Sequence, residues 1–342
     1  MTTAYVTHPL CTGHHVPGHP ERPARIQAVW SMLEYAGLEE RMHLLHPRPV
    51  GDDKILWVHT AEYVQMLHVC ANHDHGVRFD ADTIALPETP EIARLSAGGA
   101  VLAVDQVMTG EADNALVVTR PPGHHAIPQR AMGFCFLGNI AIGARYAQKV
   151  HGVDRVMIVD YDVHHGNGTQ DMFYEDDSVL FISTHQHPFY PGTGRLEETG
   201  AGAGRGYTIN IPLTAGHGDD DYATIYRDII WPAARRFRPQ LILVSAGFDA
   251  HWSDPLAMMM LSLRGLAHLT QELICMAQEL CDGKIIFIME GGYDTQVLAH
   301  GMRNVAHALL GDDEISDPLG EHRAFDQDVS ELIDQVQALH NL

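Results

Sequence analysis

The sequence predicts an α/β fold in which a mostly parallel central sheet carries helices on both faces. Short apolar runs rich in β-branched residues recur at 115–119, 156–160, 179–183, 207–211, 241–245 and 285–289. Several of these runs are separated by helical stretches at about 138–150, 220–237 and 263–281. Such alternation is typical of βαβ units. Because no linker or break in composition interrupts residues 1–342, we expect one domain, with a core over about 5–310 and a helical tail over about 315–342.

The first third of the chain is predicted to contain one strand and three helices. The strand spans 4–8, and a helix begins near Pro23 and runs to Tyr35, with Gly37 as its C-cap. Further helices are expected at 61–72 and about 90–108, and the stretch between them is expected to be a polar loop. The loop before Pro23 is dense in histidine and glycine. We expect it to face a substrate, with no metal ligand among its histidines, which are His8, His14, His15 and His19.

Composition limits the function classes. The chain has 22 basic and 44 acidic residues, a formal net charge of −22, which argues against nucleic-acid binding. A negative surface attracts cationic substrates and also keeps a protein soluble. The five cysteines form no C-x-x-C pair, which favours a reducing compartment. Neither a secretory signal nor an apolar run long enough for a membrane span is present, so a cytoplasmic protein is predicted.

The most informative stretch is 155–170, R-V-M-I-V-D-Y-D-V-H-H-G-N-G-T-Q. Its apolar strand runs into Asp160, Asp162, His164 and His165, at the strand end where open parallel sheets bind ligands. If the segment stays extended, Asp160, Asp162 and His164 point to one side. Asp and Gly after a strand are also ordinary turn formers. Since Asp and His are zinc ligands, however, Asp162 and His164 are predicted to supply two of the three protein ligands of a catalytic metal site.

Other strand ends add polar groups of the same kind. The run ending at Thr119 leads into His124 and His125, the run at 241–245 leads into Asp249, and the run at 285–289 leads into Tyr293. Asp249 is the natural third metal ligand. Metal-activated water, histidines for acid–base chemistry and a phenol that stabilises an oxyanion suit hydrolysis of an amide.

These residues resemble the zinc-dependent histone deacetylase family of the arginase–deacetylase superfamily. The matching motifs follow the family's order: R-P-P-G-H-H-A at 120–126, G-F-C-F-L-G-N at 133–139, D-Y-D-V-H-H-G-N-G-T-Q at 160–170, S-A-G-F-D-A with D-P-L at 245–256, and E-G-G-Y-D at 290–294. The sequences of these motifs are similar to those of class II deacetylases and their bacterial relatives, including acetylpolyamine amidohydrolases.

The resemblance implies a role for each matching residue. Asp162, His164 and Asp249 would bind zinc, with ferrous iron as an alternative metal. His125 would be the general base and acid, and His124 an electrostatic partner oriented by Asp160. Tyr293 would polarise the scissile carbonyl. Asn167 stands where other members have a carboxylate, so we expect His125 to lose its proton more readily here.

The resemblance also implies substrate and cation sites. Gly133 and Phe134 would form an acyl-lysine tunnel with Leu256 at its mouth. The aspartate that grips the substrate would be Asp80 or Asp82, and we favour Asp82. A structural potassium site would be formed by Asp160, Asp162, His164, Ser183 and Thr184. A second monovalent site would be formed by Phe173, Asp176 and Val179.

The predicted activity is therefore removal of an acetyl or other short acyl group from an amine such as acetyl-lysine or an acetylpolyamine. The substrate is expected to be cationic, and the state of assembly, including a homo-oligomer, is left open. Two alternatives compete with this prediction. One is a dimanganese ureohydrolase like arginase, which needs more Asp and His ligands than are found here. The other is a catalytically silent, zinc-dependent protein that binds acylated ligands.

Overall fold

A computed structural model describes residues 2–73, 76–322 and 327–342. Its core is an eight-stranded sheet in the order β2-β1-β5-β10-β9-β6-β7-β8, in which every pairing is parallel. The α/β prediction is confirmed. The strands are β1 (Thr3–Thr7), β2 (His43–Leu45), β5 (Asn114–Val118), β6 (Val156–Asp160), β7 (Val179–Gln186), β8 (Thr208–Leu213), β9 (Leu241–Ala246) and β10 (Ile285–Met289), with a separate pair formed by β3 (Val77–Arg78) and β4 (Ile84–Ala85).

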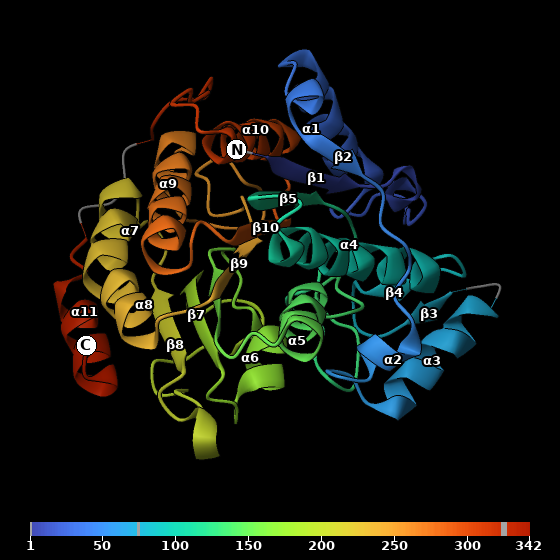
Figure 1. Cartoon of the computed structure of the whole chain (residues 1–342), viewed down its shortest axis with the longest axis horizontal. Coiled ribbons are helices and arrows are strands. Elements are labelled where there is room, and N and C mark those ends of the chain that lie inside the picture. Colours follow the sequence, from blue (N-terminus) through green and yellow to red (C-terminus); the bar gives the residue numbers. More distant parts are fainter. Residues whose placement is uncertain (1, 74–75, 323–326) are drawn as a thin grey trace.

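Helices cover both faces of the sheet (Figure 1). They are α1 (Pro23–Tyr35), α2 (Asp52–Ile55), α3 (Ala61–Ala71), α4 (Thr89–Thr109), α5 (Asn139–His151), α6 (Asn167–Phe173), α7 (Asp219–Ile225), α8 (Trp231–Phe237), α9 (Leu263–Leu280), α10 (Thr295–Leu310) and α11 (Ser330–His340). One apolar core lies between the sheet and α1, α7, α9 and α10, and a second lies between the sheet and α4 and α5. Alternate residues of a strand enter opposite cores: Met157 and Val159 pack in the first, Val156 and Ile158 in the second.

Local sequence signals explain several helix boundaries. Pro23 opens α1, where its missing N–H costs nothing, and Gly37 follows the helix with a φ of +65°. The side chains of Thr60 and Ser262 cap α3 and α9 by accepting backbone N–H groups three residues on. Asp294 caps α10 in the same manner, directly after the predicted catalytic tyrosine. Within the described residues, none of the helices combines the length and apolar character needed to cross a membrane.

The structure corrects the sequence predictions at three places. The expected polar loop between α3 and α4 contains the antiparallel pair β3 and β4. The central segment does not stay extended to His164, because β6 ends at Asp160 and the chain then bends. The helix expected over 220–237 is formed by α7 and α8 joined by a π-helical turn at Tyr226–Ile230. The strand β2 and the helices α6 and α10 had not been assigned from sequence.

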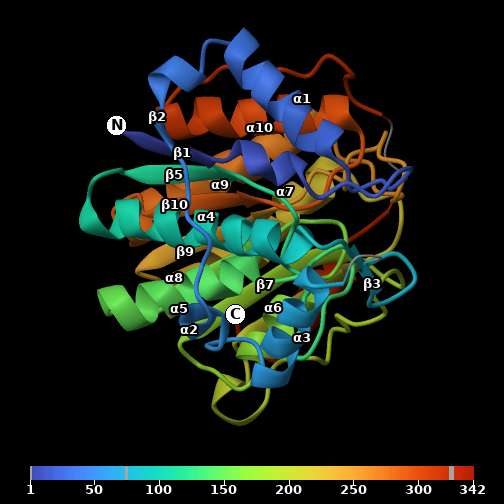
Figure 2. The same ribbon diagram turned by 90° about the vertical axis from the view of Figure 1, so that its right-hand side faces the viewer.

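The loops that follow the parallel strands gather at one edge of the sheet, on the right of Figure 2. Strand β10 lies between β5 and β9 although it comes last among the strands in sequence. The loop after β10 is therefore placed between the loops after β5 and β9. This topology brings residues 120–126, 160–165, 247–254 and 290–294 together at the site.

A buried ion cluster fixes the N-terminal loop against this edge. The Glu21 carboxylate accepts hydrogen bonds from Arg120 Nε at 2.7 Å and Arg120 Nη2 at 2.6 Å, and Arg25 Nη1 lies 3.3 Å away. All three side chains are fully buried. Burial raises the pKa of Glu21, but the two guanidinium groups outweigh it and hold the pKa at about 2, below the ordinary 4.5.

The substitution Glu21→Gln tests this cluster. Removing the charge leaves two buried guanidinium groups uncompensated, so we expect the free energy of unfolding near pH 7 to fall by about 3 kcal/mol. The pKa of Glu21 is lower in the folded state than in the unfolded state. Its carboxylate therefore contributes its full stabilisation above pH 4.5 and loses that stabilisation as pH falls toward 2. Because of Glu21, the free energy of unfolding of the wild type should fall by about 1.4 kcal/mol per pH unit below pH 4.5. Urea titrations at several pH values should show this slope in the wild type and not in the variant.

A matched control is Glu279→Gln, which breaks the exposed pair with Arg235. It should leave the free energy of unfolding nearly unchanged, because solvent screens an exposed ion pair. Equal pH slopes for the wild type and Glu21→Gln would contradict the assigned role of the buried cluster.

Candidate active site

A cavity of about 270 Å³ opens at the loop-bearing edge of the sheet. All four residues assigned to substrate binding, Gly133, Phe134, Leu256 and Asp82, line it. The remaining lining residues are Pro20, His125, His164, Phe189, Tyr190 and Tyr293. Sequence analysis had not assigned Phe189 and Tyr190, although they follow β7 at the same edge. A larger cavity of about 500 Å³, against α11, contains none of these residues.

The three predicted metal ligands meet beside this cavity. His164 Nδ1 lies 3.2 Å from Asp162 Oδ1 and 3.1 Å from Asp249 Oδ2, and the three groups present ligand atoms within 4.8 Å of one another. Backbone N–H groups hold both carboxylates: Val163 donates to Asp249 Oδ1 at 2.9 Å, and Gly291 donates to Asp162 Oδ2 at 2.8 Å. Loops after β6 and β9 therefore form one ligand set.

The environment of this set fits a divalent ion. A Cβ atom at Gly247 would lie 2.2 Å from Asp162 Oδ2, and one at Gly291 would lie 2.2 Å from Asp249 Oδ2, so only glycine leaves room for the carboxylates. Two fully buried carboxylates face one imidazole, and bound cations commonly offset such excess negative charge. Burial lowers the pKa of His164, but hydrogen bonds to the two aspartates raise it to about 10.

The tandem histidines lie next to the metal-ligand set on the loop after β5. Their ring centroids are 4.0 Å apart. His124 Nδ1 lies 3.0 Å from Asp160 Oδ2, and His125 Nδ1 lies 2.8 Å from Asn167 Oδ1. Asn167 Nδ2 points to the His125 carbonyl at 3.4 Å. The Asn167 carbonyl therefore faces the ring, so Nδ1 carries the proton and Nε2 is free to accept one.

The two rings differ in charge because their partners differ. Burial lowers the pKa of His124, but Asp162 and Asp160 outweigh burial and raise it well above its ordinary value. Burial together with the neighbouring His124 and His164 lowers the pKa of His125 far below its ordinary value. An amide at Asn167 cannot offset this effect. His125 is therefore a neutral imidazole beside a cationic one, a pair suited to a base and an electrostatic stabiliser.

Tyr293 is held by contacts on three sides. The Asp254 carboxylate accepts a hydrogen bond from the Tyr293 N–H at 2.7 Å, and the Arg25 guanidinium lies 5.0 Å from the centre of the ring. Phe134 packs edge-on against the ring at 5.9 Å. Burial raises the pKa of the Tyr293 phenol well above its ordinary value. The phenol therefore keeps its proton and can act as a hydrogen-bond donor in the cavity.

The two candidate aspartates of the β3–β4 segment, Asp80 and Asp82, make different contacts. Asp80 accepts from the N–H groups of Asp82 and Thr83 and, at 3.3 Å, from Gly133 N, while Thr83 Oγ1 accepts from Phe134 N at 3.1 Å. These bonds fix the turn at Gly133 and Phe134, both of which have positive φ. Asp82 lines the cavity and Asp80 does not. This placement favours Asp82 as the residue that contacts a substrate.

The predicted potassium ligands lie just behind the site. Asp160 and Ser183 are paired across β6 and β7, and the hydroxyl of Thr184 is buried with no hydrogen-bond partner among the described residues. At the second predicted site, the Phe173 carbonyl accepts from Asp176 N, and Arg145 and Ser178 bind the Asp176 carboxylate. Metal binding there stays a prediction.

The N-terminal loop contributes to the cavity through Pro20. His14 is buried and lies 2.8 Å from Thr89 Oγ1, and His19 packs at 4.6 Å from the Phe134 ring. Among the described residues, none of the four loop histidines belongs to a group of potential metal ligands. That the loop faces a substrate stays a prediction.

The α/β fold and this arrangement suit a hydrolytic centre, in which water would attack a carbonyl group beside a metal-ligand set. Comparisons with known proteins specify the class further. The chain matches the family described as "Histone deacetylase domain" over residues 19–309 and therefore belongs to the histone deacetylase family.

Individual relatives agree with this assignment. A protein from Archaeoglobus fulgidus named "Probable deacetylase" is 42% identical, over 92% of this chain and 88% of that protein. A "Histone deacetylase-like amidohydrolase" from Pseudomonas aeruginosa is 44% identical, over 81% of this chain and 73% of the relative. The crystal structure of the HDA15 HD domain superposes with a TM-score of 0.90 at 35% identity, covering 99% of this chain and 96% of that one.

Family and site together show that the chain is a hydrolytic enzyme of the deacetylase and amidohydrolase class. The fold is that of the arginase–deacetylase group, as the resemblance had implied. The residues that sequence analysis placed at the catalytic centre also lie together in space. It assigned no role to Asp254, Arg25 or Glu290, whose contacts arise only on folding.

The substitution Asn167→Asp tests the electrostatic role of the amide. A carboxylate 2.8 Å from His125 Nδ1 would favour the imidazolium form and raise the pKa of His125. Because a general base must be neutral, the acid limb of the pH profile of kcat/KM should move to higher pH. The control Asn167→Ser removes the amide without adding charge. An unshifted acid limb in Asn167→Asp would contradict this account of His125.

Proposed function

We propose that the chain is a zinc-dependent amidohydrolase that removes acetyl or other short acyl groups from amines. The observation that carries this proposal is the convergence of Tyr293, the His124–His125 pair and the Asp162–His164–Asp249 set on one cavity of about 270 Å³. A cavity of this size suits a short acyl chain with part of its amine. Its aromatic walls suit an alkyl linker, and Asp82 supplies negative charge for a cationic amine.

Each residue has a defined part in this chemistry. Zinc held by Asp162, His164 and Asp249 would polarise the carbonyl and lower the pKa of water. His125 accepts a proton from the attacking water at Nε2, since Asn167 holds Nδ1, and returns it to the leaving amine. The cationic ring of His124 and the Tyr293 hydroxyl stabilise negative charge as it develops on the carbonyl oxygen.

The nature of the amine and the structural cation are part of the same proposal. Acetyl-lysine and acetylpolyamines both present a cationic group to Asp82 and to a chain of net charge −22. We infer a potassium ion at Asp160, Asp162, His164, Ser183 and Thr184, because the buried Thr184 hydroxyl has no other partner among the described residues. Ferrous iron is the alternative to zinc, since the same ligand types bind both metals.

The substitution Tyr293→Phe tests the proposed function. Losing one donor to the developing oxyanion should lower kcat by about 100- to 1000-fold, while KM changes little. Turnover of zinc-loaded protein is measured on acetyl-lysine peptide, acetylputrescine, acetylspermidine and trifluoroacetyl-lysine peptide, with metal content as a control. Undiminished turnover by Tyr293→Phe would refute the role of the phenol, and no turnover by the wild type on any of the four would refute the proposed function.

The substitution Asp249→Asn tests the metal site. The wild type should bind about one zinc per chain at the tight site, and the variant should lose that zinc and its activity, because a neutral amide leaves two of three strong ligands. Elemental analysis after dialysis against a chelator gives the stoichiometry. Asp313→Asn, on the surface after α10, is the control and should keep its metal. Retention of stoichiometric zinc by Asp249→Asn would place the metal elsewhere.

A further inference from the structure

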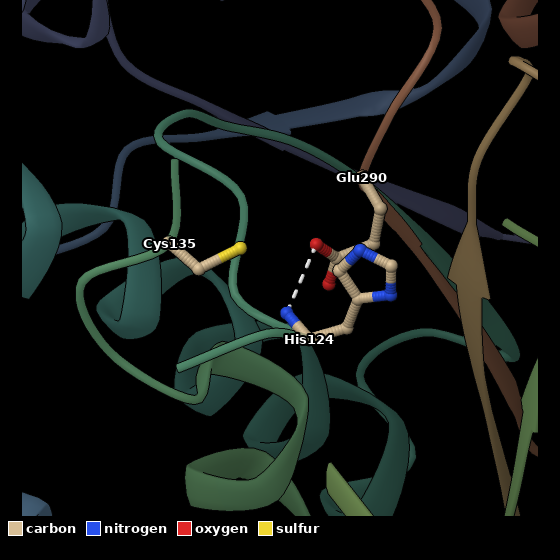
Figure 3. A group of neighbouring side chains, drawn as sticks. All are labelled: His124, Cys135 and Glu290. Atoms are coloured by element: carbon tan, nitrogen blue, oxygen red, sulfur yellow. Dashed lines mark hydrogen bonds between the residues drawn. The ribbon is translucent and has the colours of Figure 1, made fainter. Parts of the chain in front are cut away.

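A further buried carboxylate, Glu290, lies beside His124 (Figure 3) and takes no part in the chemistry above. It follows β10 and is fully buried. Its Oε2 atom accepts hydrogen bonds from the backbone N–H of Gly123 at 2.7 Å and from that of His124 at 3.2 Å. Cys135 is the third member of this cluster, within 4.8 Å. Glu290 thus binds the backbone of the histidine loop and not its rings.

Glu290 is itself held firmly by the rest of the fold. Its N–H donates to the carbonyl of Ala246 at 3.0 Å, and its carbonyl accepts from Arg25 Nη2 at 2.5 Å. Arg25 Nε also donates to the carbonyl of Gly292 at 2.7 Å. The next residue, Gly291, donates to the metal-ligand carboxylate of Asp162. The position of the Glu290 carboxylate is therefore set by the sheet and by the metal-ligand set.

Other contacts hold the start of the histidine loop, where the Pro121 carbonyl accepts from Ser96 Oγ at 2.9 Å and from Asn139 Nδ2 at 3.1 Å. Pro121 and Pro122 lack N–H groups, so Gly123 and His124 offer the first backbone donors before the histidine rings. On the opposite side, the His124 carbonyl accepts from Gly168 N at 2.9 Å and from Thr169 N at 3.2 Å. The loop is thus clamped between Glu290 and the start of α6, the helix that contains Asn167.

We propose that Glu290 is a positioning residue for the tandem histidines, because its carboxylate binds the backbone at 123–124 and so sets where both imidazoles lie relative to the substrate carbonyl. The same residue links the histidine loop to the Tyr293 loop, so one contact aligns the base with the oxyanion donor. The residue types would also suit a second metal, but His124 Nδ1 is paired with Asp160 at 3.0 Å and His124 Nε2 lies 3.9 Å from Asp162 Oδ2. This inference rests on the proposed function for its kinetic readout.

The test compares Glu290→Ala, Glu290→Gln and Cys135→Ala in the zinc-loaded full chain on acetyl-lysine peptide. A displacement of catalytic groups by about 1 Å can cost 100-fold in rate, so Glu290→Ala should lower kcat at least about 10-fold with KM nearly unchanged. Glu290→Gln retains a carbonyl acceptor for the two N–H groups and should stay within about threefold of the wild type. Cys135→Ala removes the neighbouring thiol and its contact with the His125 backbone N–H but leaves both Glu290 contacts in place, and it should also retain activity.

Two kinetic outcomes would overturn the proposal. Equal losses in Glu290→Ala and Cys135→Ala would mean that packing alone is at work, and equal losses in Glu290→Ala and Glu290→Gln would mean that charge and not position matters. If Glu290→Ala does not fold, Glu290→Asp tests the same contact with less lost volume, and an unchanged kcat in it would refute the positioning role.

A spectroscopic readout separates this proposal from the proposed function. In zinc-loaded protein with ¹⁵N-labelled histidine, the imidazole signals of His124 and His125 should move in Glu290→Ala and return in Glu290→Gln. Unmoved signals in Glu290→Ala would overturn the positioning role even if no substrate is turned over. If the wild type shows no turnover but the histidine signals move as expected in Glu290→Ala, the deacylase function alone would be refuted.

Discussion

The site depends on one constraint, the burial of negative charge at the ends of adjacent strands. Asp160, Asp162, Asp249, Asp254 and Glu290 are each at most 6% exposed. An isolated buried carboxylate is very costly, so each needs donors or a counter-charge. Backbone N–H groups at the strand ends and the His124 and His164 rings meet part of this need, and the proposed divalent ion would meet the rest. In the proposed mechanism the groups that stabilise the carboxylates are also the catalytic groups, so stability and chemistry would depend on one set of contacts.

Much of this site could be predicted from sequence because its residues follow strands. Parallel strands in one sheet end at the same edge, so Asp162, Asp249 and Tyr293 could be assigned to one site without a structure. Helices with clear periodicity and caps, such as Pro23–Tyr35 and Ala61–Ala71, were predicted to within about one residue at each end. The helix α10 was not predicted, although Asp294 and Gly311 cap it. The β3–β4 pair was missed because strands of two residues leave almost no periodic signal.

Several contacts between distant segments could not be predicted from the sequence. Three such contacts join residues that are 39 to 167 positions apart: Glu290 with the histidine loop, Asp254 with the Tyr293 N–H, and Asp80 with the Phe134 turn. Each involves backbone groups, whose positions cannot be inferred from residue type. Glu21 gave no sign in sequence of a neutralising role between Arg25 and Arg120. The residues with a chemical role could therefore be predicted from the motifs, whereas the contacts that position them could not.

The place of β10 in the sheet has a consequence for how the protein is made. Strands β1, β2 and β5 form one half of the sheet and β6 to β9 the other, and β10 joins them. A nascent chain that has not yet released residues 285–289 from the ribosome would have two half-sheets, with β5 and β9 as open edges that attract other strands. Ribosomal stalling just before this strand would therefore leave the chain most exposed to aggregation, when nearly all of its core residues are already synthesised.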